Sequence, residues 1–471
     1  MKYGTRSGML PLGIVVTACG LLYALMPEHG LAWPIVVIAG VAVVGVLTVP
    51  SGRRVEQVRR MAKSAAELAD LGRSAEAIAA FDGLAARFGE SRDGAVRAAV
   101  ASALFNKGHE LSRLNRDGEA LAAFDEVVER FGEDRGTDVI YLVAQARVNR
   151  GASLTKLNRF DEALAEFQGV VRDFGEPRST RMREVDARAT AGTALSLVRA
   201  GRHHDAILAA DDGIRRFAGA SEPRLELQVA GLLLLKAEAL GGLGRHDEEL
   251  AIYAGIIDRH GGTVDPDMSS LVAQALVSRG SIFLQQHGLD EACAAEDEAF
   301  EWISDRILDP PDLSLIEMAA QAAARKGLAL FEGGRLAESL AAYDRALARI
   351  GDPRDPSLLR GRSSVLNNRG TALAKLERWD EALAAYEEAL AIRQEAGEPS
   401  SNTIALVLVN KAEALASLGR RGEAVALCDE VENLLAGVEH PTARMVLDET
   451  ARIRQICGPS RGRRGSNARR P

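Results

Sequence analysis

The sequence predicts an all-α protein: a solenoid of helix-turn-helix repeats preceded by two transmembrane helices. Three observations lead to this prediction. The chain repeats itself from residue 55 onward, its prolines fall between the repeats, and two long uncharged stretches lie near the N-terminus. Aromatic residues make up only 4% of the 471 residues, which fits stacked helices with modest cores better than a β-sandwich.

The predicted organisation has four parts. Residues 1–52 form a two-span transmembrane hairpin, and residues 53–440 form nine repeats. Residues 441–457 form an amphipathic helix that caps the array, as the ends of solenoids require. Residues 458–471 form a disordered tail with five arginines and no acid, and we interpret it as a solubilising end rather than a lipid or nucleic-acid ligand.

An acidic residue marks each repeat at a nearly constant spacing. Successive marking residues are separated by 43 positions, except for one interval of 47 and one of 42. The marking residues are Glu76, Glu119, Glu162, Asp205, Glu248, Glu291, Glu338, Glu381 and Glu423. A period of this size is typical of solenoids, in which each repeat packs on its neighbours.

Each repeat divides into two helices with a helical spacing of apolar residues. The first helix carries a small residue that permits close packing: Ala65, Gly108, Gly151, Ala194, Ala237, Gly280, Gly327, Gly370 and Ala412. A glycine or asparagine generally ends that helix, because both tolerate the left-handed conformation: Gly72, Asn115, Asn158, Gly201, Gly244, Gly334 and Gly419. The prolines after Pro50 and before the tail all fall at the joints: Pro177, Pro223, Pro266, Pro310, Pro311, Pro353, Pro356, Pro399 and Pro441.

The second helix has an alanine at its packing seam: Ala77, Ala120, Ala163, Ala206, Ala292, Ala382 and Ala424. In six repeats an aromatic residue follows four positions later: Phe81, Phe124, Phe167, Tyr253, Tyr343 and Tyr386. Ala210, Glu296 and Cys428 take the aromatic position in the fourth, sixth and ninth repeats.

These columns resemble the tetratricopeptide repeat. The resemblance includes Asn-x-Gly in the first helix, as in residues 106–108, 149–151 and 368–370, with residues 410–412 a near match. It covers roughly residues 55–440, although the repeats are longer than the usual length of about 34 residues. The resemblance implies a right-handed α-solenoid whose first helices line a groove for a protein or peptide partner.

One column suggests a binding site in that groove. The residue before the small position is basic in seven repeats: Lys107, Arg150, Lys236, Arg279, Lys326, Arg369 and Lys411. These residues could form a cationic stripe for an acidic peptide or a C-terminal carboxylate. Alternatively, they pair with an acidic column on the second helices, which is the interpretation that we favour: Asp82, Asp125, Asp211, Asp297, Asp344, Glu387 and Asp429.

The asparagines that precede the basic column are the better ligand candidates, because an amide can bind a peptide backbone. They are Asn106, Asn149, Asn368 and Asn410. The alternative is a purely structural role for these residues in the repeat. The sequence does not decide between the two.

The N-terminal region has the pattern of a membrane hairpin. Residues 9–26 and 31–49 are uncharged and each is about long enough to span a bilayer. Lys2 and Arg6 precede the first stretch, and Arg53 and Arg54 begin a basic flank after the second. The positive-inside rule therefore predicts a cytoplasmic repeat domain on a cell (inner) membrane, with residues 9–49 and the basic flank contacting lipid.

An alternative for the first stretch is a cleaved signal peptide. Ala18-Cys19-Gly20 is a small-x-small triplet, and Val16-Thr17-Ala18-Cys19 resembles a bacterial lipoprotein cleavage site. Cleavage there would leave the second stretch as a single anchor. The other cysteines, Cys293, Cys428 and Cys457, are far apart and form no CxxC pair, so we expect reduced thiols.

No catalytic motif is present, and we expect neither an enzyme nor a cofactor, a metal or a small-molecule substrate. The chain lacks HExxH, GxxxxGK[ST] and GxSxG sequences. His203-His204 is an isolated pair that we interpret as a solvent-facing turn. The net charge is −8 although both ends are basic, so the acidic body is not expected to bind nucleic acid.

The sequence therefore predicts a membrane-anchored scaffold that binds partner proteins or peptides. The alternative is a regulatory or sensory subunit of an integral-membrane complex, in which the hairpin couples the two parts. An enzyme with an unrecognised site is a third and weaker interpretation. The composition suggests a bacterial source.

Overall fold

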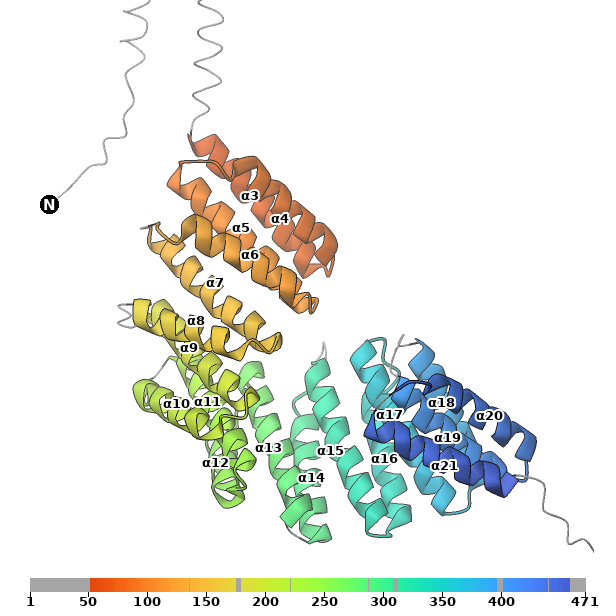
Figure 1. Ribbon diagram of the computed structural model, residues 1–471. Helices are drawn as coiled ribbons and strands as arrows, with labels where there is room; N and C mark the ends of the chain where they lie inside the picture. Colours follow the sequence, from red (N-terminus) through yellow and green to blue (C-terminus); the bar gives the residue numbers. More distant parts are fainter. Residues whose placement is uncertain are drawn as a thin grey trace, which may run out of the picture. The chain divides into compact units, whose positions relative to one another are not determined.

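The computed structural model describes residues 51–134, 136–174, 179–220, 222–286, 288–307, 312–395, 401–438 and 440–457 (Figure 1). Every regular element in these ranges is a helix, and they contain no strand. Among them, no helix is both long enough and apolar enough to span a bilayer. The predicted hairpin over residues 9–49 and the predicted tail lie outside these ranges, so both stay predictions.

The chain divides into two compact units, one ending at Leu157 and the other beginning at Asn158. In the first unit the helices are α3 (Ser51–Asp70), α4 (Ser74–Phe88), α5 (Gly94–Arg113), α6 (Asp117–Phe131) and α7 (Thr137–Lys156). Each helix packs on the next, and α5 also contacts α3 and α7. The sequence predicts one continuous array, so this division is a feature that only the tertiary structure reveals.

The second unit continues the same order. Its helices are α8 (Phe160–Phe174), α9 (Thr180–Arg199), α10 (His203–Phe217), α11 (Pro223–Gly242), α12 (His246–His260), α13 (Pro266–Gln286), α14 (Leu289–Ser304), α15 (Leu313–Glu332), α16 (Leu336–Ile350), α17 (Pro356–Lys375), α18 (Trp379–Glu395), α19 (Ser401–Ser417), α20 (Arg421–Leu434) and α21 (Pro441–Cys457). Pro223, Pro266, Pro356 and Pro441 are the first residues of their helices, where a missing N–H costs nothing.

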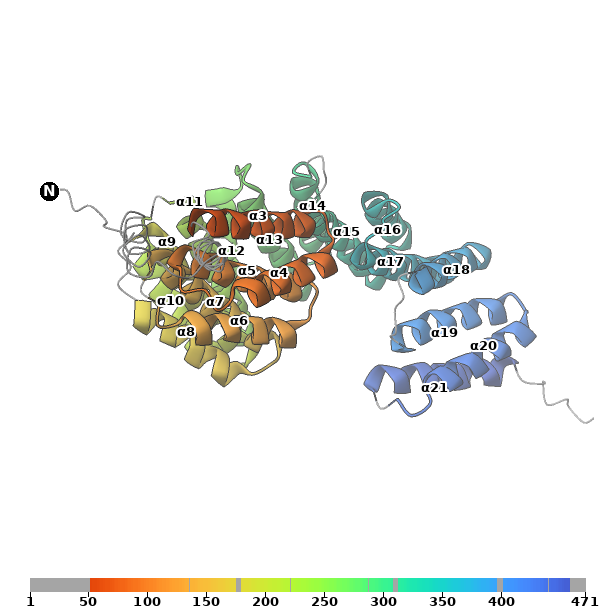
Figure 2. The same ribbon diagram turned by 90° about the horizontal axis from the view of Figure 1, so that it is seen from above.

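The helices of this unit form two layers. Each odd-numbered helix from α9 to α19 contacts the next odd-numbered helix, whereas the backbones of the even-numbered helices make no such close approach in the described part of the unit. Arg345 of α16 reaches α14 through its long side chain and pairs with Asp297 and Glu301. The odd-numbered helices are the first helices of the repeats, so they are packed on more sides than the second helices. At the C-terminal end, α19, α20 and α21 pack together (Figures 1 and 2).

The small and aromatic columns of the sequence meet in the same hairpin. A Cβ atom added at Gly370 would lie 2.5 Å from the Tyr386 ring, and one at Gly327 would lie 2.6 Å from the Tyr343 ring. Gly108 and Phe124 show the same arrangement in the first unit. Each ring therefore occupies the space that a glycine leaves on the first helix, and both tyrosines and Phe124 are almost fully buried.

The predicted helix ends are confirmed. Positive φ angles occur at all seven expected positions: Gly72, Asn115, Asn158, Gly201, Gly244, Gly334 and Gly419. Glu377 takes this conformation after α17, with a φ of 59°. A left-handed conformation is costly for glutamate, so Glu377 is a strained exception in the series.

The acidic residues that mark the repeats have a role that the sequence pattern did not reveal. In eight repeats an arginine three positions earlier donates to the marking carboxylate at the start of the second helix: Arg73–Glu76, Arg116–Glu119, Arg159–Glu162, Arg202–Asp205, Arg245–Glu248, Arg335–Glu338, Arg378–Glu381 and Arg420–Glu423. Hydrogen bonding from Arg73 lowers the pKa of Glu76, and hydrogen bonding from Arg335 lowers the pKa of Glu338. Each pair places a carboxylate in the first turn of a second helix, where negative charge is favourable.

The repeats without an aromatic residue fill the same space differently. Glu296 is fully buried on α14 and accepts from Arg325 on α15, with Oε1–Nε and Oε2–Nη2 distances of 2.7 and 3.0 Å. Cys428 on α20 is fully buried, and its thiol lies 3.8 Å from the Thr450 carbonyl oxygen of α21. Cys293, Cys428 and Cys457 are buried free thiols.

Candidate functional site

The basic column on the first helices is paired throughout. All seven residues make ion pairs with N–O distances of 2.5 to 3.0 Å, and six of these pairs join the two predicted columns: Lys107–Asp82, Arg150–Asp125, Lys236–Asp211, Lys326–Asp297, Arg369–Asp344 and Lys411–Glu387. Each of the six joins a first helix to the second helix of the preceding repeat. This geometry favours the structural interpretation, and partner binding by the column stays a prediction.

Arg279 is the exception among the seven. On α12 the position of the acidic column is occupied by Ala254, which cannot form an ion pair. Arg279 instead pairs with Glu298 on α14, with an Nη2–Oε2 distance of 2.6 Å. The remaining acid of the column, Asp429 on α20, pairs with Arg454 of α21. The capping helix therefore continues the charge pairing beyond the last repeat.

The four candidate asparagines are partly buried and differ in their surroundings. Asn106 and Asn149 belong to the first unit, and Asn368 and Asn410 to the second. In the second unit, Asn410 Nδ2 donates to Asn367 Oδ1 over 2.9 Å, and Asn367 Nδ2 lies 3.5 Å from Asn368 Oδ1. The structure thus brings Asn368 and Asn410 into one amide network through Asn367, which was not among the predicted site residues.

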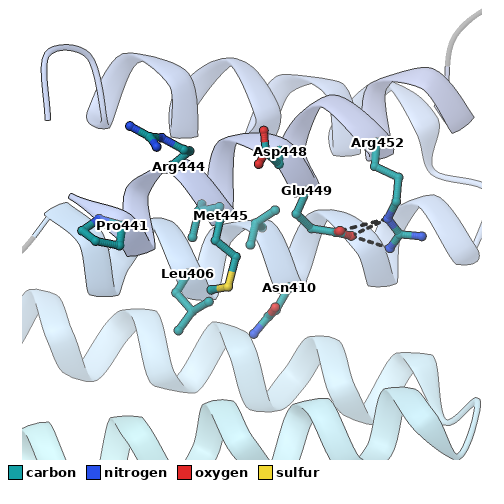
Figure 3. Close-up of a pocket in the computed structure, with 10 residues that line it drawn as sticks. Leu406, Asn410, Pro441, Arg444, Met445, Asp448, Glu449 and Arg452 are labelled. Carbon is teal, nitrogen blue, oxygen red and sulfur yellow. Dashed lines mark hydrogen bonds and ion pairs between the residues drawn. The ribbon is translucent and has the colours of Figure 1, made fainter. Parts of the chain in front are cut away.

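Asn410 also lines a groove between α19 and α21 (Figure 3), with a volume of about 720 Å³. The α19 side consists of Leu406, Val409 and Asn410. The α21 side adds seven residues: Pro441, Arg444, Met445, Val446, Asp448, Glu449 and Arg452. We call this feature the α19–α21 groove.

The α19–α21 groove has an apolar floor. Met445 extends from α21 toward Leu406 and Asn410 (Figure 3), and its side chain is 59% exposed. Methionine is flexible and polarisable, so it adapts to partner side chains of different shapes. An exposed methionine beside a leucine and a valine provides an apolar surface that a partner can cover.

Charged side chains of both signs surround this floor. Arg452 donates to Glu449 on the same helix, with an Nε–Oε1 distance of 2.8 Å, and to Glu413 of α19, with an Nη2–Oε1 distance of 2.9 Å. Hydrogen bonding to these two acids raises the pKa of Arg452, which stays charged. Arg444 and Asp448 add one charge of each sign. The groove therefore offers both signs of charge around an apolar centre.

This arrangement provides groups that can recognise a partner backbone. Asn410 Nδ2 donates one N–H to Asn367, and the amide oxygen of Asn410 is the group that can accept from a partner's backbone N–H. The described residues contain no group of three His, Cys, Asp or Glu side chains arranged to hold a metal ion. His203, at the start of α10, is partly buried rather than solvent-facing, and His204 is exposed.

Most of the groove was not predicted from the sequence. Residues 441–457 were expected only to cap the array, although Met445 is part of their amphipathic pattern. The available signal was that Met445 is a large apolar residue on the helix that follows the last of the nine repeats. A helix that ends a solenoid leaves one face without a neighbour, and this is where an apolar residue stays exposed.

Sequence comparison matches three segments of the chain to one repeat family. Profiles of the tetratricopeptide repeat match residues 105–177, 314–356 and 361–436. These matches support the tetratricopeptide repeat family. The third match contains Asn368 and Asn410, so these two candidates lie within a recognised tetratricopeptide segment. No curated protein matches the chain in sequence.

Solved structures with a similar fold share little sequence with the chain. The apo form of RapI is 10% identical with a TM-score of 0.49, and the match covers 66% of this chain and 80% of RapI. The quorum sensor NprR from B. thuringiensis is 16% identical with a TM-score of 0.46, covering 81% and 99%. BtubC from P. vanneervenii is 18% identical with a TM-score of 0.41, covering 51% and 94%.

Proposed function

We propose that the protein is a membrane-anchored scaffold that binds an extended segment of a partner protein in the α19–α21 groove. The observation that carries this proposal is the apolar floor at Met445, Leu406 and Val409 beside the amide of Asn410. An apolar side chain of the partner covers the floor, and its backbone N–H donates to Asn410. Tetratricopeptide repeats in the chain support a binding role, since such solenoids act through extended surfaces.

The anchoring part of the proposal is supported by the N-terminal sequence. Residues 9–26 and 31–49 are uncharged, and basic residues flank the pair of stretches on both sides. A hairpin with this charge distribution places the repeats on the cytoplasmic face of the membrane. The scaffold would then hold its partner close to the membrane surface.

The test uses two substitutions on the same helix. Met445 and Ile456 are both exposed on α21, at 59% and 54%, but only Met445 lines the groove. The full-length chain and the Met445→Glu and Ile456→Glu variants are used to capture partners from membrane and cytosolic extracts. Captured segments are then located by cross-linking and mass spectrometry.

We expect Met445→Glu to lose the partner and Ile456→Glu to retain it, because only the former puts a charge on the apolar floor. Cross-links of the parent should fall on α19 and α21. Retention of the partner by both variants would place the contact elsewhere and contradict the groove. Circular dichroism confirms that both variants keep the helical content of the parent.

A further inference from the structure

A second cavity lies in the middle of the second unit, away from the α19–α21 groove. It has a volume of about 550 Å³ and is lined by residues of α9, α11, α12 and α13. The floor is formed by His246, Glu249 and Tyr253 of α12. Polar residues of α11 and α13 surround it: Glu238, Gln274, Ser278, Ser281 and Gln285.

Glu249 departs from the repeat pattern. It occupies the seam position that is alanine in seven other repeats, and those alanines are almost completely buried. Glu249 is buried as well, with an exposed fraction of only 7%. A carboxylate thus stands where the fold otherwise places a methyl group.

A second departure makes room for this carboxylate. Gly241 of α11 faces Glu249, and a Cβ atom at this glycine would lie 2.6 Å from Glu249 Oε2. The corresponding position carries a side chain in other repeats, for example Thr155, Val198 and Ala374. The missing side chain of Gly241 therefore leaves the space that the Glu249 carboxylate occupies.

Among the residues that the structure describes, no permanently charged cation contacts Glu249. Tyr253 Oη donates to Glu249 Oε1 over 3.1 Å, and His246 Nδ1 lies 3.0 Å from Oε2. Burial, followed by the charge of Glu249, raises the pKa of Tyr253, so this hydroxyl stays protonated. Arg199 also lines the cavity but forms no ion pair with Glu249 in the described structure.

Two other buried carboxylates of this unit are treated differently. Glu296 pairs with Arg325, and Asp186 pairs with Arg216. Buried charges in proteins are generally paired, because desolvation of an isolated charge is costly. Glu249 is buried like these two residues, but no arginine pairs with it in the described part of the chain. Its carboxylate faces the cavity instead.

We propose that this cavity binds an organic cation, a guanidinium or ammonium group, which pairs with Glu249. The hydroxyls of Ser278 and Ser281 and the amide oxygens of Gln274 and Gln285 accept from the remaining N–H groups of the cation. The cation is either a free amine or the arginine or lysine side chain of a partner. This inference does not depend on the α19–α21 groove.

The test measures binding to the full-length chain by isothermal titration calorimetry. One probe is an acetylated and amidated Gly-Arg-Gly peptide, and its control carries citrulline, which keeps the shape of arginine without the charge. A second probe, agmatine, presents the same guanidinium as a free amine. The substitutions are Glu249→Gln, which keeps the size of the side chain, and Asp247→Asn, which removes an exposed acid two residues away.

We expect the arginine peptide or agmatine to bind the parent with saturation, and Glu249→Gln to weaken this binding by about tenfold or more. Asp247→Asn should change it by less than about twofold, because its charge is solvated. Tighter binding of the peptide than of agmatine identifies a protein side chain as the source, and equal or tighter binding of agmatine identifies a free amine.

Three results would overturn the proposal: no saturable binding of either probe, equal binding of the citrulline peptide, or equal binding by Glu249→Gln. Thermal melting separates a lost site from a lost fold. The glutamine can still accept from Tyr253, so the melting temperature of Glu249→Gln should equal or exceed that of the parent.

Discussion

Two hairpins of the second unit fill the same space with different chemistry. In the hairpin of α17 and α18, the ring of Tyr386 packs on Gly370. In the hairpin of α13 and α14, the carboxylate of Glu296 takes the corresponding place over Gly280, where an added Cβ atom would lie 2.7 Å from Oε1. Both hairpins have a glycine at the contact, but an aromatic ring fills the space in one, and in the other a buried carboxylate fills it and pairs with Arg325 of the following helix, α15.

This difference shows which part of the repeat pattern is essential. The small residue on the first helix is present in both hairpins, and it sets how closely the two helices approach. The group that fills the space can vary if its buried charge is neutralised by a partner, as Arg325 neutralises Glu296. Positions that depart from the pattern without such compensation, such as Glu249, are therefore the ones to test for function.

The largest effect is expected from removing a ring. Tyr386→Ala should lower the free energy of unfolding by about 3–5 kcal/mol, since it leaves a cavity against Gly370 in a closely packed hairpin. Urea denaturation followed by circular dichroism measures the change. A loss below about 1 kcal/mol would show that the ring is not the main contact of this hairpin.

A smaller effect is expected from breaking the ion pair. Glu296→Ala should lower the free energy of unfolding by about 2–3 kcal/mol, because it leaves the Arg325 guanidinium without its partner. The Arg325 side chain is 25% exposed, so water can solvate it in part and the loss is below that of a fully buried pair. The matched control is Glu338→Ala, whose pair with Arg335 is solvent-exposed and should contribute little.

The smallest expected effect is on the pH dependence of stability. Burial raises the pKa of Glu296, although Arg325 opposes this shift, whereas hydrogen bonding from Arg335 lowers the pKa of Glu338. A group whose pKa is raised in the folded state stabilises the fold fully at pH values below its unfolded-state pKa. This stabilisation is lost as the pH rises through the folded-state pKa. A group whose pKa is lowered in the folded state stabilises the fold at pH values above its unfolded-state pKa. This stabilisation is lost as the pH falls through the folded-state pKa.

Melting temperatures of the parent, Glu296→Gln and Glu338→Gln, measured between about pH 4 and pH 7, test these signs. Relative to Glu296→Gln, the parent should gain stability as the pH falls. Relative to Glu338→Gln, it should lose stability over the same change. The same sign for both comparisons would mean that burial does not control the ionisation of Glu296.

The sequence by itself determined the repeated helices, their ends and the filling of the hairpins in which a glycine faces an aromatic residue, as Gly370 faces Tyr386. These features depend on residues close together in the chain: the helical spacing of apolar positions, the glycine or asparagine at each helix end, and the small and aromatic columns within one repeat. Local conformational preference and a constant period make such features readable without a structure. The membrane hairpin rests on the same kind of pattern and stays a prediction.

Beyond the predicted pairing of the basic and acidic columns, only the tertiary structure decided which side chains of neighbouring helices meet or stay exposed. The pairing of Arg279 with Glu298, the amide network of Asn367 and Asn410, and the exposure of Met445 depend on how neighbouring helices meet. The same holds for the close approach of Glu249 to Gly241. A repeated sequence specifies that helices stack, but the exact approach of two helices decides which side chains meet and which are left facing a cavity.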